Sequence, residues 1–395
     1  MYHRRQYFFA AFFALAFVFS SGTIAPDAPF DRPQDVVQET VPTEIPPVVP
    51  TPEVVVSIPT VAQSTHQPTP DPLRGIYLTG WTAGTTKGLN RAFTLIDEAG
   101  INAVIIDIKD ATGRLSYQPQ DSELIASGVG TNRIRDLSGL IAQLHARGVY
   151  VIGRLTVFQD PFYAQSHPED TFTDTRTGAL WTDYKNIAWL RPDRETVWDY
   201  TAAVARDAYA QGFDEINLDY VRYPSDGPLQ FIDLTHMTKS KAEVIADFFV
   251  GMDQRLRQEG IPVSADVFGL TMSAKDDVGI GQKAVLIAPS VDALAPMLYP
   301  SHFWNGTYGI PVPAKEPYKV IYKSLSDGIA KLAAAGIPKE KLRPWFQDFD
   351  LLGISYTPDM VRAQIDAARD LGINSWMMWD PRGYYRIDAY QPVVY

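Results

Sequence analysis

The sequence of 395 residues contains no cysteine. Disulfide bonds, cysteine-ligated iron–sulfur clusters and a cysteine nucleophile are therefore excluded. The six histidines show neither H-x-x-x-H nor H-E-x-x-H spacing, and the chain has no G-x-S-x-G motif. These absences argue against a zinc hydrolase and against an esterase with a nucleophile elbow. We expect neither a metal ion nor an organic cofactor.

Basic residues are also outnumbered. The chain has 35 Lys and Arg against 46 Asp and Glu, which gives a net charge of −11. Such a charge repels a phosphate backbone, so a nucleic-acid partner is disfavoured. A neutral or weakly charged ligand fits better. Hydrophobic residues make up 46% of the chain, which is enough to build a large core.

The N-terminus has the order of a targeting segment. His3-Arg4-Arg5 precedes 13 consecutive apolar residues from Tyr7 to Phe19. This run is shorter than a typical spanning helix and matches the basic and apolar regions of a signal peptide. We assign residues 1–23 as a signal peptide or, if it is not cleaved, an N-terminal membrane anchor. The protein is therefore expected to be exported, and either secreted or anchored at the outer face of the cytoplasmic membrane or cell envelope.

Residues 24–72 differ in composition from the rest, with twelve prolines and no glycine. Proline lacks the backbone N–H that helices and sheets need, and proline-rich chains favour an extended polyproline conformation. We predict a disordered linker over 24–72 and one folded domain over 73–395.

The domain alternates between strand-like and helix-like segments. Three helices are expected to end at the similar junctions 99–101, 335–337 and 371–373, where a central glycine stops the helix before the next strand. Eight strands that alternate with helices predict an α/β protein of the (β/α)₈ TIM-barrel class. An open doubly wound sheet is the alternative, although no glycine-rich nucleotide loop follows the first strand. The expected strands are 75–79, 102–110, 149–158, 215–223, 263–270, 291–299, 342–348 and 374–380.

The fourth strand carries an acid close to its end. Ile216, Leu218 and Tyr220 alternate with Asn217 and Asp219, the period of two that a strand imposes. The active sites of TIM barrels lie at the C-terminal ends of the strands, so polar and aromatic side chains there are candidates for substrate binding. These candidates are Asp107, Lys109, Asp110, Arg154, Asn217, Arg222, Tyr299, His302, Trp304, Gln347, Asp348, Asp350, Trp379 and Asp380.

Several tryptophans accompany these polar groups, among them Trp81, Trp304 and Trp379. A sugar ring stacks its C–H face on an aromatic plane while its hydroxyl groups form hydrogen bonds. Each tryptophan alone is also compatible with an ordinary core or surface position. Asp107 and Lys109 share the parity of one strand face, which predicts a pair that either holds sugar hydroxyl groups or serves as a structural ion pair.

Glycoside hydrolysis needs two carboxyl groups on either side of one bond. Asp219 and Asp266 are the preferred catalytic pair, because they lie late in two consecutive strands that a barrel places side by side. Apolar neighbours of Asp266 are expected to raise its pKa and suit it to the acid role. Asp348 and Asp350 are rival partners for Asp219. A structural salt bridge from Asp219 to Arg154 or Arg222 is the non-catalytic alternative.

Four motifs together carry a resemblance: I-D-I-K-D at 106–110, L-D-Y-V-R-Y-P at 218–224, M-L-Y-P-S-H at 297–302 and W-M-M-W-D-P at 376–381. In this order they resemble a bacterial family of barrel domains of unknown function that are regarded as glycoside hydrolases. The resemblance implies a (β/α)₈ fold and distant kinship to α-amylase-type barrels, with a strand-four aspartate as nucleophile and a strand-five carboxylate as acid/base. Asp219 matches the first position. At the second, Asp266 stands where amylases carry glutamate.

The sequence thus favours an exported glycoside hydrolase that acts on a polysaccharide or oligosaccharide, as a monomer, by a two-carboxylate and retaining mechanism. One alternative is a catalytically inactive barrel that binds carbohydrate at the cell surface. Another is a scaffold protein displayed by the linker. The sequence does not distinguish sugar, anomer, or endo from exo action.

Overall fold

The computed structural model describes residues 66–351 and 353–390. The predicted signal or anchor segment and most of the predicted linker lie outside the described residues. Residues 66–72, at the end of the predicted linker, contact the barrel: Gln67 N donates to Asp214 (2.7 Å) and Thr69 Oγ1 donates to the Tyr150 hydroxyl (3.1 Å). Within these residues, no helix is both long and apolar enough to span a bilayer.

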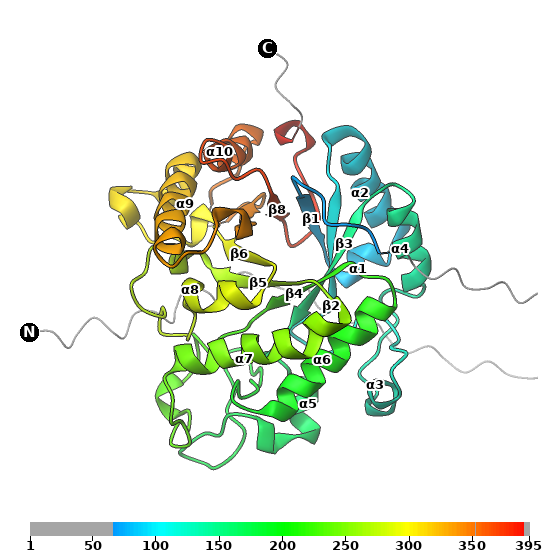
Figure 1. The fold of residues 1–395 in the computed structure, drawn as a ribbon, viewed down its shortest axis with the longest axis vertical. Helices are drawn as coiled ribbons and strands as arrows, with labels where there is room; N and C mark the ends of the chain where they lie inside the picture. Colours follow the sequence, from blue (N-terminus) through cyan, green and yellow to red (C-terminus); the bar gives the residue numbers. More distant parts are fainter. Residues whose placement is uncertain (1–65, 352, 391–395) are drawn as a thin grey trace, which may run out of the picture. The chain divides into compact units, whose positions relative to one another are not determined.

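Eight parallel strands close into a barrel in the order β1 to β8, with β1 paired to β8. Figure 1 shows the helices arranged around these strands. The predicted TIM barrel is confirmed, and the open-sheet alternative is wrong because the first and last strands share a ladder. The strands are β1 Arg74–Leu78, β2 Ala103–Lys109, β3 Tyr150–Thr156, β4 Glu215–Asp219, β5 Val263–Phe268, β6 Ala293–Met297, β7 Trp345–Gln347 and β8 Trp376–Trp379.

The helices cover the outside of the barrel. They are α1 Gly80–Ala83, α2 Thr86–Ala99, α3 Ser122–Ser127, α4 Leu137–His145, α5 Pro161–Ser166, α6 Glu195–Ala210, α7 Lys241–Leu256, α8 Ala284–Ile287, α9 Pro317–Ala334 and α10 Pro358–Arg369. The short helices α1, α3 and α5 lie in the loops that follow β1, β2 and β3. Gly100, Gly336 and Gly372 have φ values of 67°, 72° and 74°, a left-handed conformation that glycine adopts without strain. The predicted helix ends at these junctions are confirmed.

Two buried clusters divide the core. One fills the barrel interior and includes Tyr77, Ile105, Ile152, Trp345 and Met377. The other lies between the strands and the helices and contains the alternate residues of the same strands. Because every strand is buried on both faces, a polar side chain on the inner face must find its partners inside the barrel.

At the N-terminal end of the barrel, a buried ion pair ties β4 to the segment before β7. Arg343 Nη1 donates to both oxygens of Glu215 (2.7 and 2.9 Å), and Ser264 and Tyr150 donate to the same carboxylate. Side-chain exposure is 8% for Arg343 and 1% for Glu215. Glu215 is the first residue of β4 and so lies at the end of the barrel opposite the candidate site, where Arg343 neutralises its charge.

We expect Arg343→Gln to lower the free energy of unfolding by about 3–5 kcal/mol, because it leaves the buried Glu215 charge unpaired. Urea denaturation measures this loss. The matched control is Arg206→Gln, which breaks an exposed pair with Glu259 and should cost less than about 1 kcal/mol. Equal losses of unfolding free energy in the two variants would contradict a stabilising role for the buried Arg343–Glu215 pair.

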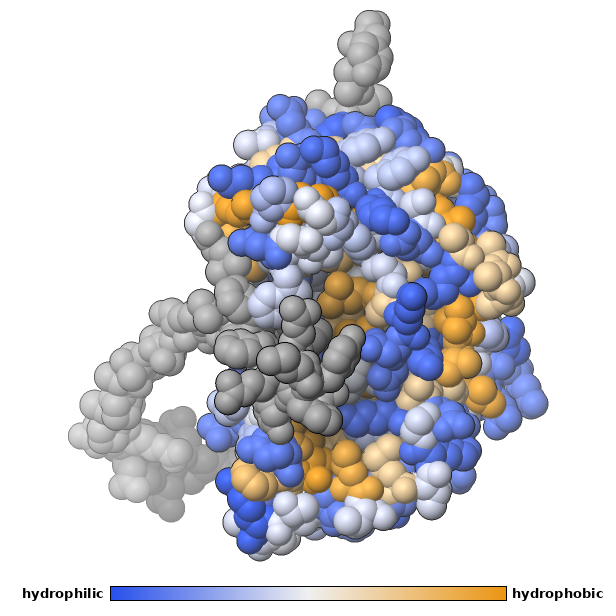
Figure 2. Space-filling view, turned by 90° about the vertical axis from the view of Figure 1, so that its left-hand side faces the viewer, coloured by the Kyte–Doolittle hydropathy of each residue, from blue (hydrophilic) through white to orange (hydrophobic). Residues whose placement is uncertain are grey.

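The surface in Figure 2 is mixed, with hydrophobic residues in several separate groups among hydrophilic ones. Large apolar side chains that are at least 38% exposed include Tyr318 and Tyr322, whose rings stack on α9 with centroids 5.8 Å apart. Both tyrosines lie on a helix and not in a segment that directly follows a strand, and single exposed apolar side chains of this kind are common on protein surfaces.

Candidate active site

The alternation along β4 aims two polar side chains into the barrel. Ile216 and Leu218 pack in the outer cluster, so Asn217 and Asp219 face inward. Asn217 pairs with Ser264 of β5 and Leu218 with Ala265. The same register therefore places Asp266 beside Asp219, on neighbouring strands that lie about 4.8 Å apart.

A single arginine links Asp219 to a second acid. Arg154 of β3 donates to Asp219 Oδ2 through Nε (3.0 Å) and through Nη2, and its Nη1 donates to Asp107 (2.7 Å). The Tyr77 hydroxyl donates to the other oxygen of Asp107 (2.6 Å). Burial raises the pKa of Asp107, and the charge of Arg154 opposes that rise. Arg154 thus stabilises a negative charge on Asp219 within the buried interior.

Asp266 has a different environment. Its Oδ1 accepts hydrogen bonds from Asn217 Nδ2 (2.9 Å) and Trp345 Nε1 (2.7 Å), whereas its Oδ2 has no hydrogen-bond partner among the described residues. Burial raises the pKa of Asp266 well above its ordinary value, and the charge of Asp219 raises it further, against the opposing charge of Arg154. The two carboxyl groups therefore differ: Asp219 is bonded to a guanidinium, while burial and the charge of Asp219 drive Asp266 toward the protonated form.

Strand β4 ends at Asp219, earlier than the predicted end near Tyr223. Tyr220 has φ of 55°, which is unusual for a residue with a side chain and takes the chain out of the strand. In this conformation the Tyr220 N–H donates to Asp219 Oδ1 (2.6 Å). The turn therefore fixes the orientation of the Asp219 carboxylate.

Aromatic rings lie against this cluster. Tyr77 stacks on Trp379 with ring centroids 3.8 Å apart, and the Arg154 guanidinium lies 5.0 Å from the Trp379 ring. Tyr299 is buried in the barrel interior, and its pKa is raised by burial and by the charges of Asp266 and Asp219. Of the predicted site residues, the structure brings together Asp107, Arg154, Asn217, Asp219, Asp266, Tyr299 and Trp379.

The predicted pairing of Asp107 with Lys109 is wrong. A register shift in β2 pairs Asp107 with Arg154 but Lys109 with Leu155, whose side chain belongs to the outer cluster. The extra residue thus turns Lys109 away from Asp107. Lys109 instead forms an ion pair with Asp160, and its amine lies 4.8 Å from the Tyr200 ring.

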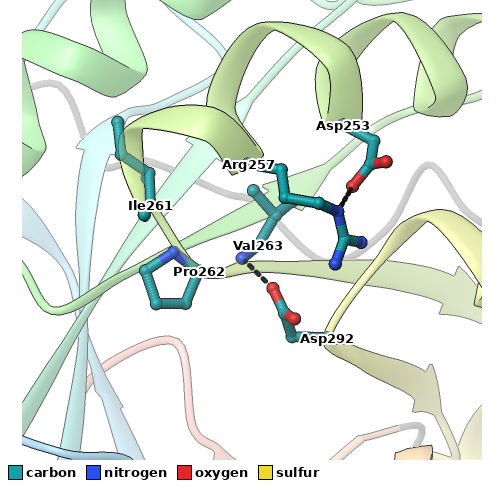
Figure 3. A pocket seen from close by; sticks show the side chains of 7 residues that line it. Asp253, Arg257, Ile261, Pro262, Val263 and Asp292 are labelled. Carbon is teal, nitrogen blue, oxygen red and sulfur yellow. Dashed lines mark hydrogen bonds and ion pairs between the residues drawn. The ribbon is translucent and has the colours of Figure 1, made fainter.

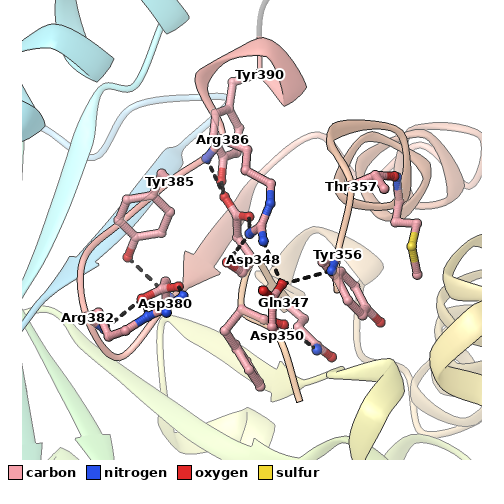
Figure 4. Close-up of polar contacts among 12 residues, drawn as sticks. Gln347, Asp348, Asp350, Tyr356, Thr357, Asp380, Arg382, Tyr385, Arg386 and Tyr390 are labelled. Atoms are coloured by element: carbon pink, nitrogen blue, oxygen red, sulfur yellow. Dashed lines mark hydrogen bonds and ion pairs between the residues drawn. The ribbon is translucent and has the colours of Figure 1, made fainter. Parts of the chain in front are cut away.

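Three predicted acids belong to a separate network near the C-terminus (Figure 4). Asp348 accepts hydrogen bonds from Arg386 and from the Tyr390 hydroxyl, and Asp350 also pairs with Arg386. Asp380 accepts hydrogen bonds from the backbone and side chain of Arg382. Trp345 and Gln347 face the barrel interior, and side chains alternate along a strand. Asp348, the next residue, therefore points to the outer side of the barrel. These contacts attach the last segment of the domain. None of the three carboxylates bonds to a residue of the Asp219 cluster, although the Tyr385 hydroxyl connects the backbones of Asp380 and Tyr77.

The remaining candidates lie around the same end of the barrel with partners of their own. Asp110 pairs with Arg133 (2.7 Å), and Gln347 accepts from Ser301 N (3.1 Å) and donates to Phe349 O (2.8 Å). His302 packs edge-on against Tyr299, and burial lowers its pKa to about 4. Trp304 is 42% exposed. Arg222 lies close to Tyr220, with its guanidinium 5.2 Å from that ring.

Sequence reasoning did not include Tyr77 and Trp345 among the site residues, although each makes a direct hydrogen bond to an acid of the cluster. The alternation of inward and outward side chains along a strand was the signal that could have identified both residues. Tyr77 alternates with Ile76 and Leu78 of the outer cluster, and Trp345 shares the parity of Gln347. Both residues could have been assigned to the inner face once the strand register was known.

No group of three or more His, Cys, Asp or Glu able to hold a metal occurs in 66–351 or 353–390. A cavity of about 170 Å³ lies between the end of α7 and the start of β5 (Figure 3). Its polar groups are already paired, because Arg257 bonds to Asp253, and Asp292 accepts from Val263 N (2.8 Å). This cavity offers no group for catalysis.

Comparison with known families decides the classification. The family described as "Putative glycosyl hydrolase domain" matches residues 75–385. The chain belongs to this family. The match begins within β1 and ends after β8, so it includes the whole barrel apart from Arg74. A search of curated proteins found no significant relative.

Three solved structures are similar to this chain, and the likeness in fold rests on the second and third. A hypothetical protein from Ruminiclostridium thermocellum is 32% identical over 49% of this chain and 97% of its own, with a TM-score of 0.45. The PgaB (BpsB) glycoside hydrolase domain from Bordetella bronchiseptica is 14% identical over 79% of this chain and 94% of its own, with a TM-score of 0.58. The α-galactosidase TtGalA from Thermus thermophilus is 12% identical, with coverages of 82% and 66% and a TM-score of 0.50. At these last two identities the likeness concerns the fold alone.

Proposed function

We propose that this member of the glycosyl hydrolase family cleaves O-glycosidic bonds in an extracellular or cell-envelope glycan by a retaining mechanism. The observation that carries the proposal is the contrast between two adjacent carboxyl groups: Asp219, bonded to Arg154, and Asp266, whose pKa is raised by burial and by Asp219. Inward side chains on neighbouring strands in one register suit the roughly 5–5.5 Å carboxyl separation of retaining enzymes better than the wider spacing of inverting ones.

In the first step, a carboxylate oxygen of Asp219 attacks the anomeric carbon while the Asp266 Oδ2 proton moves to the glycosidic oxygen. The C–O bond to the leaving group breaks, and a glycosyl ester of Asp219 forms. In the second step, water attacks the same carbon and gives its proton to Asp266. The Asp219 carboxylate leaves, which restores both groups.

The charge of Asp219 explains how Asp266 can serve both steps. Asp219 raises the pKa of Asp266 as long as Asp219 is an anion. The ester intermediate is neutral, so this contribution disappears and the pKa of Asp266 falls. Asp266 is thus an acid when a proton must be donated and a base when one must be accepted.

Exposed aromatic rings support a carbohydrate substrate. Trp81, Tyr184, Trp304 and Tyr384 are 42–65% exposed, and each lies in a segment that follows the C-terminal end of a strand. Such rings can stack on successive sugars of a chain. Export to the envelope is the second part of the proposal, and it rests on the predicted N-terminal segment.

We expect Trp81→Ala to raise KM for a polymeric glycan by about 2- to 10-fold while kcat stays unchanged, because one stacked ring contributes roughly 0.5–1.5 kcal/mol. Trp81 is 60% exposed, so the melting temperature should not fall. Steady-state kinetics on a polymer and on a short aryl glycoside provide the measurement. A fall in kcat, or an equal change for both substrates, would contradict a role in polymer binding.

A catalytically inactive binding barrel remains the second candidate, because both Asp219 oxygens already accept hydrogen bonds from protein donors. The test is a panel of aryl glycosides and envelope glycans, assayed for released reducing ends and, by calorimetry, for binding. The double variant Asp219→Asn/Asp266→Asn serves as the blank. Turnover by the wild type and none by the blank supports the hydrolase. Equal glycan binding by both proteins without turnover would establish the binding barrel instead.

A further inference from the structure

A buried arginine beside the candidate active site has no acidic partner. Arg222 lies three residues after Asp219 and is only 7% exposed. Its Nη1 donates to Tyr223 O (3.1 Å) and Ser225 Oγ (3.0 Å). Across 66–351 and 353–390 it forms no ion pair, and its Nε and Nη2 make no hydrogen bond. A buried guanidinium is normally paired, since removing its charge from water costs several kcal/mol.

The acids around Arg222 are committed elsewhere. Asp219 already accepts two N–H groups of Arg154. Asp183 accepts four N–H groups, from Lys185 N, Ile187 N, Gln159 Nε2 and Trp189 Nε1. Burial and the charge of Asp183 raise the pKa of Asp226; the charge of Arg222 opposes this rise, although the two side chains form no hydrogen bond or ion pair among the described residues. None of the three therefore neutralises Arg222 by contact.

Three aromatic rings hold the guanidinium in place. The Arg222 side chain lies 4.8 Å from the Trp189 ring, 4.9 Å from Phe268 and 5.2 Å from Tyr220. These residues come from the loop after β3 and from the ends of β5 and β4. The rings favour a cation and restrict the rotamers of the Arg222 side chain. The planar guanidinium, with its forked N–H donors, is therefore oriented before a ligand binds.

We propose that Arg222 binds the carboxylate of an acidic sugar, a hexuronic acid residue next to the bond that is cleaved. The planar fork of Arg222 fits the two oxygens of a carboxylate. The Tyr220 ring lies 5.2 Å from Arg222 and 6.0 Å from Arg154, which bonds to Asp219, so this contact lies beside the catalytic cluster. The inference rests on the proposed function and adds its substrate class. The net charge predicted a neutral or weakly charged ligand. An acidic sugar can still bind, because salt screens the distant negative charges of the protein more than it screens a buried contact pair.

The test uses hexuronic-acid-containing oligosaccharides and the same preparation after carbodiimide activation and borohydride reduction, which converts each carboxylate to an alcohol and keeps the linkages. For the wild type we expect kcat/KM about 10- to 100-fold higher on the acidic preparation, the range of charge-assisted hydrogen bonds. Arg222→Gln should lose this discrimination, with a larger fall in kcat/KM on the acidic preparation than on the reduced one. Arg222→Lys, which keeps the charge but not the fork, should lie between them. Arg206→Gln, a surface control, should match the wild type.

The outcomes separate this inference from the proposed function. Equal turnover of both preparations by the wild type overturns the role of Arg222 and leaves the hydrolase intact. Selective binding of the acidic preparation without turnover overturns the hydrolase and keeps the carboxylate site. Neither binding nor turnover on any preparation overturns both.

Discussion

Asp219→Asn is expected to reduce kcat/KM by about 10⁴-fold or more, at or above the upper end of what one positioned catalytic group contributes. An amide cannot attack the anomeric carbon, so the glycosyl ester cannot form. Binding of the glycan should change little, because Arg154 still holds Asp107 and the aromatic rings are unaffected. Kinetics on the best substrate from the panel, with calorimetry for binding, give the two readouts.

Rescue by azide gives a second test of Asp219 as the nucleophile. Asp219→Gly opens space for a small anion, and added azide should restore turnover and yield a glycosyl azide of the opposite anomeric configuration to the substrate. Asp199→Asn is the matched control: it removes a carboxylate that is 68% exposed on α6, and its activity should equal that of the wild type. Undiminished activity of Asp219→Asn would exclude Asp219 as the nucleophile.

Asp266→Asn is expected to lower kcat/KM by about 10²- to 10⁴-fold on substrates with poor leaving groups. The loss should be small for dinitrophenyl glycosides in the first step, because a good leaving group needs no proton. The free energy of unfolding should change by less than about 1 kcal/mol, since the raised pKa of Asp266 means that a neutral amide replaces a largely neutral acid. Asparagine keeps the oxygen that accepts from Asn217 and Trp345.

The pH dependence has a definite sign. Because Asp266 must be protonated in the first step, wild-type kcat/KM should fall as pH rises through its raised pKa. In Asp219→Asn the neighbouring negative charge is gone, so the pKa of Asp266 should be lower than in the wild type. Carbon-13 NMR of the labelled carboxyl groups measures this shift. An unchanged or higher pKa would mean that the two groups do not interact.

The barrel and the orientation of β4 could be predicted because both follow from local patterns. A period of two over Glu215–Asp219 assigns Asn217 and Asp219 to one face whatever the rest of the chain does. Glycines that need a left-handed φ end helices locally as well. Eight strands that alternate with helices can then all be buried by closing into a barrel, so the fold class follows from the number of units.

The ion-pair partners of the predicted site residues could not be predicted, because they depend on the strand register and on segments distant in the sequence. One extra residue in β2 turned Lys109 outward, and the sequence carries no mark of that shift. Lys109 then pairs with Asp160 from the insertion after β3, and Asp348 pairs with Arg386, 38 residues away. Asp219 had two candidate arginines, and only the structure shows that Arg154 is bonded to it while Arg222 is not. The predicted N-terminal segment and its role in export stay predictions.

The stereochemistry of the product tests the central claim most directly. Proton NMR of the first sugar released by the wild type, recorded before mutarotation, distinguishes the two anomers. Paired action of Asp219 and Asp266 through a glycosyl ester predicts that the anomeric configuration of the substrate is retained. A product of inverted configuration would contradict the account, because it requires two carboxyl groups far enough apart to hold a water between them.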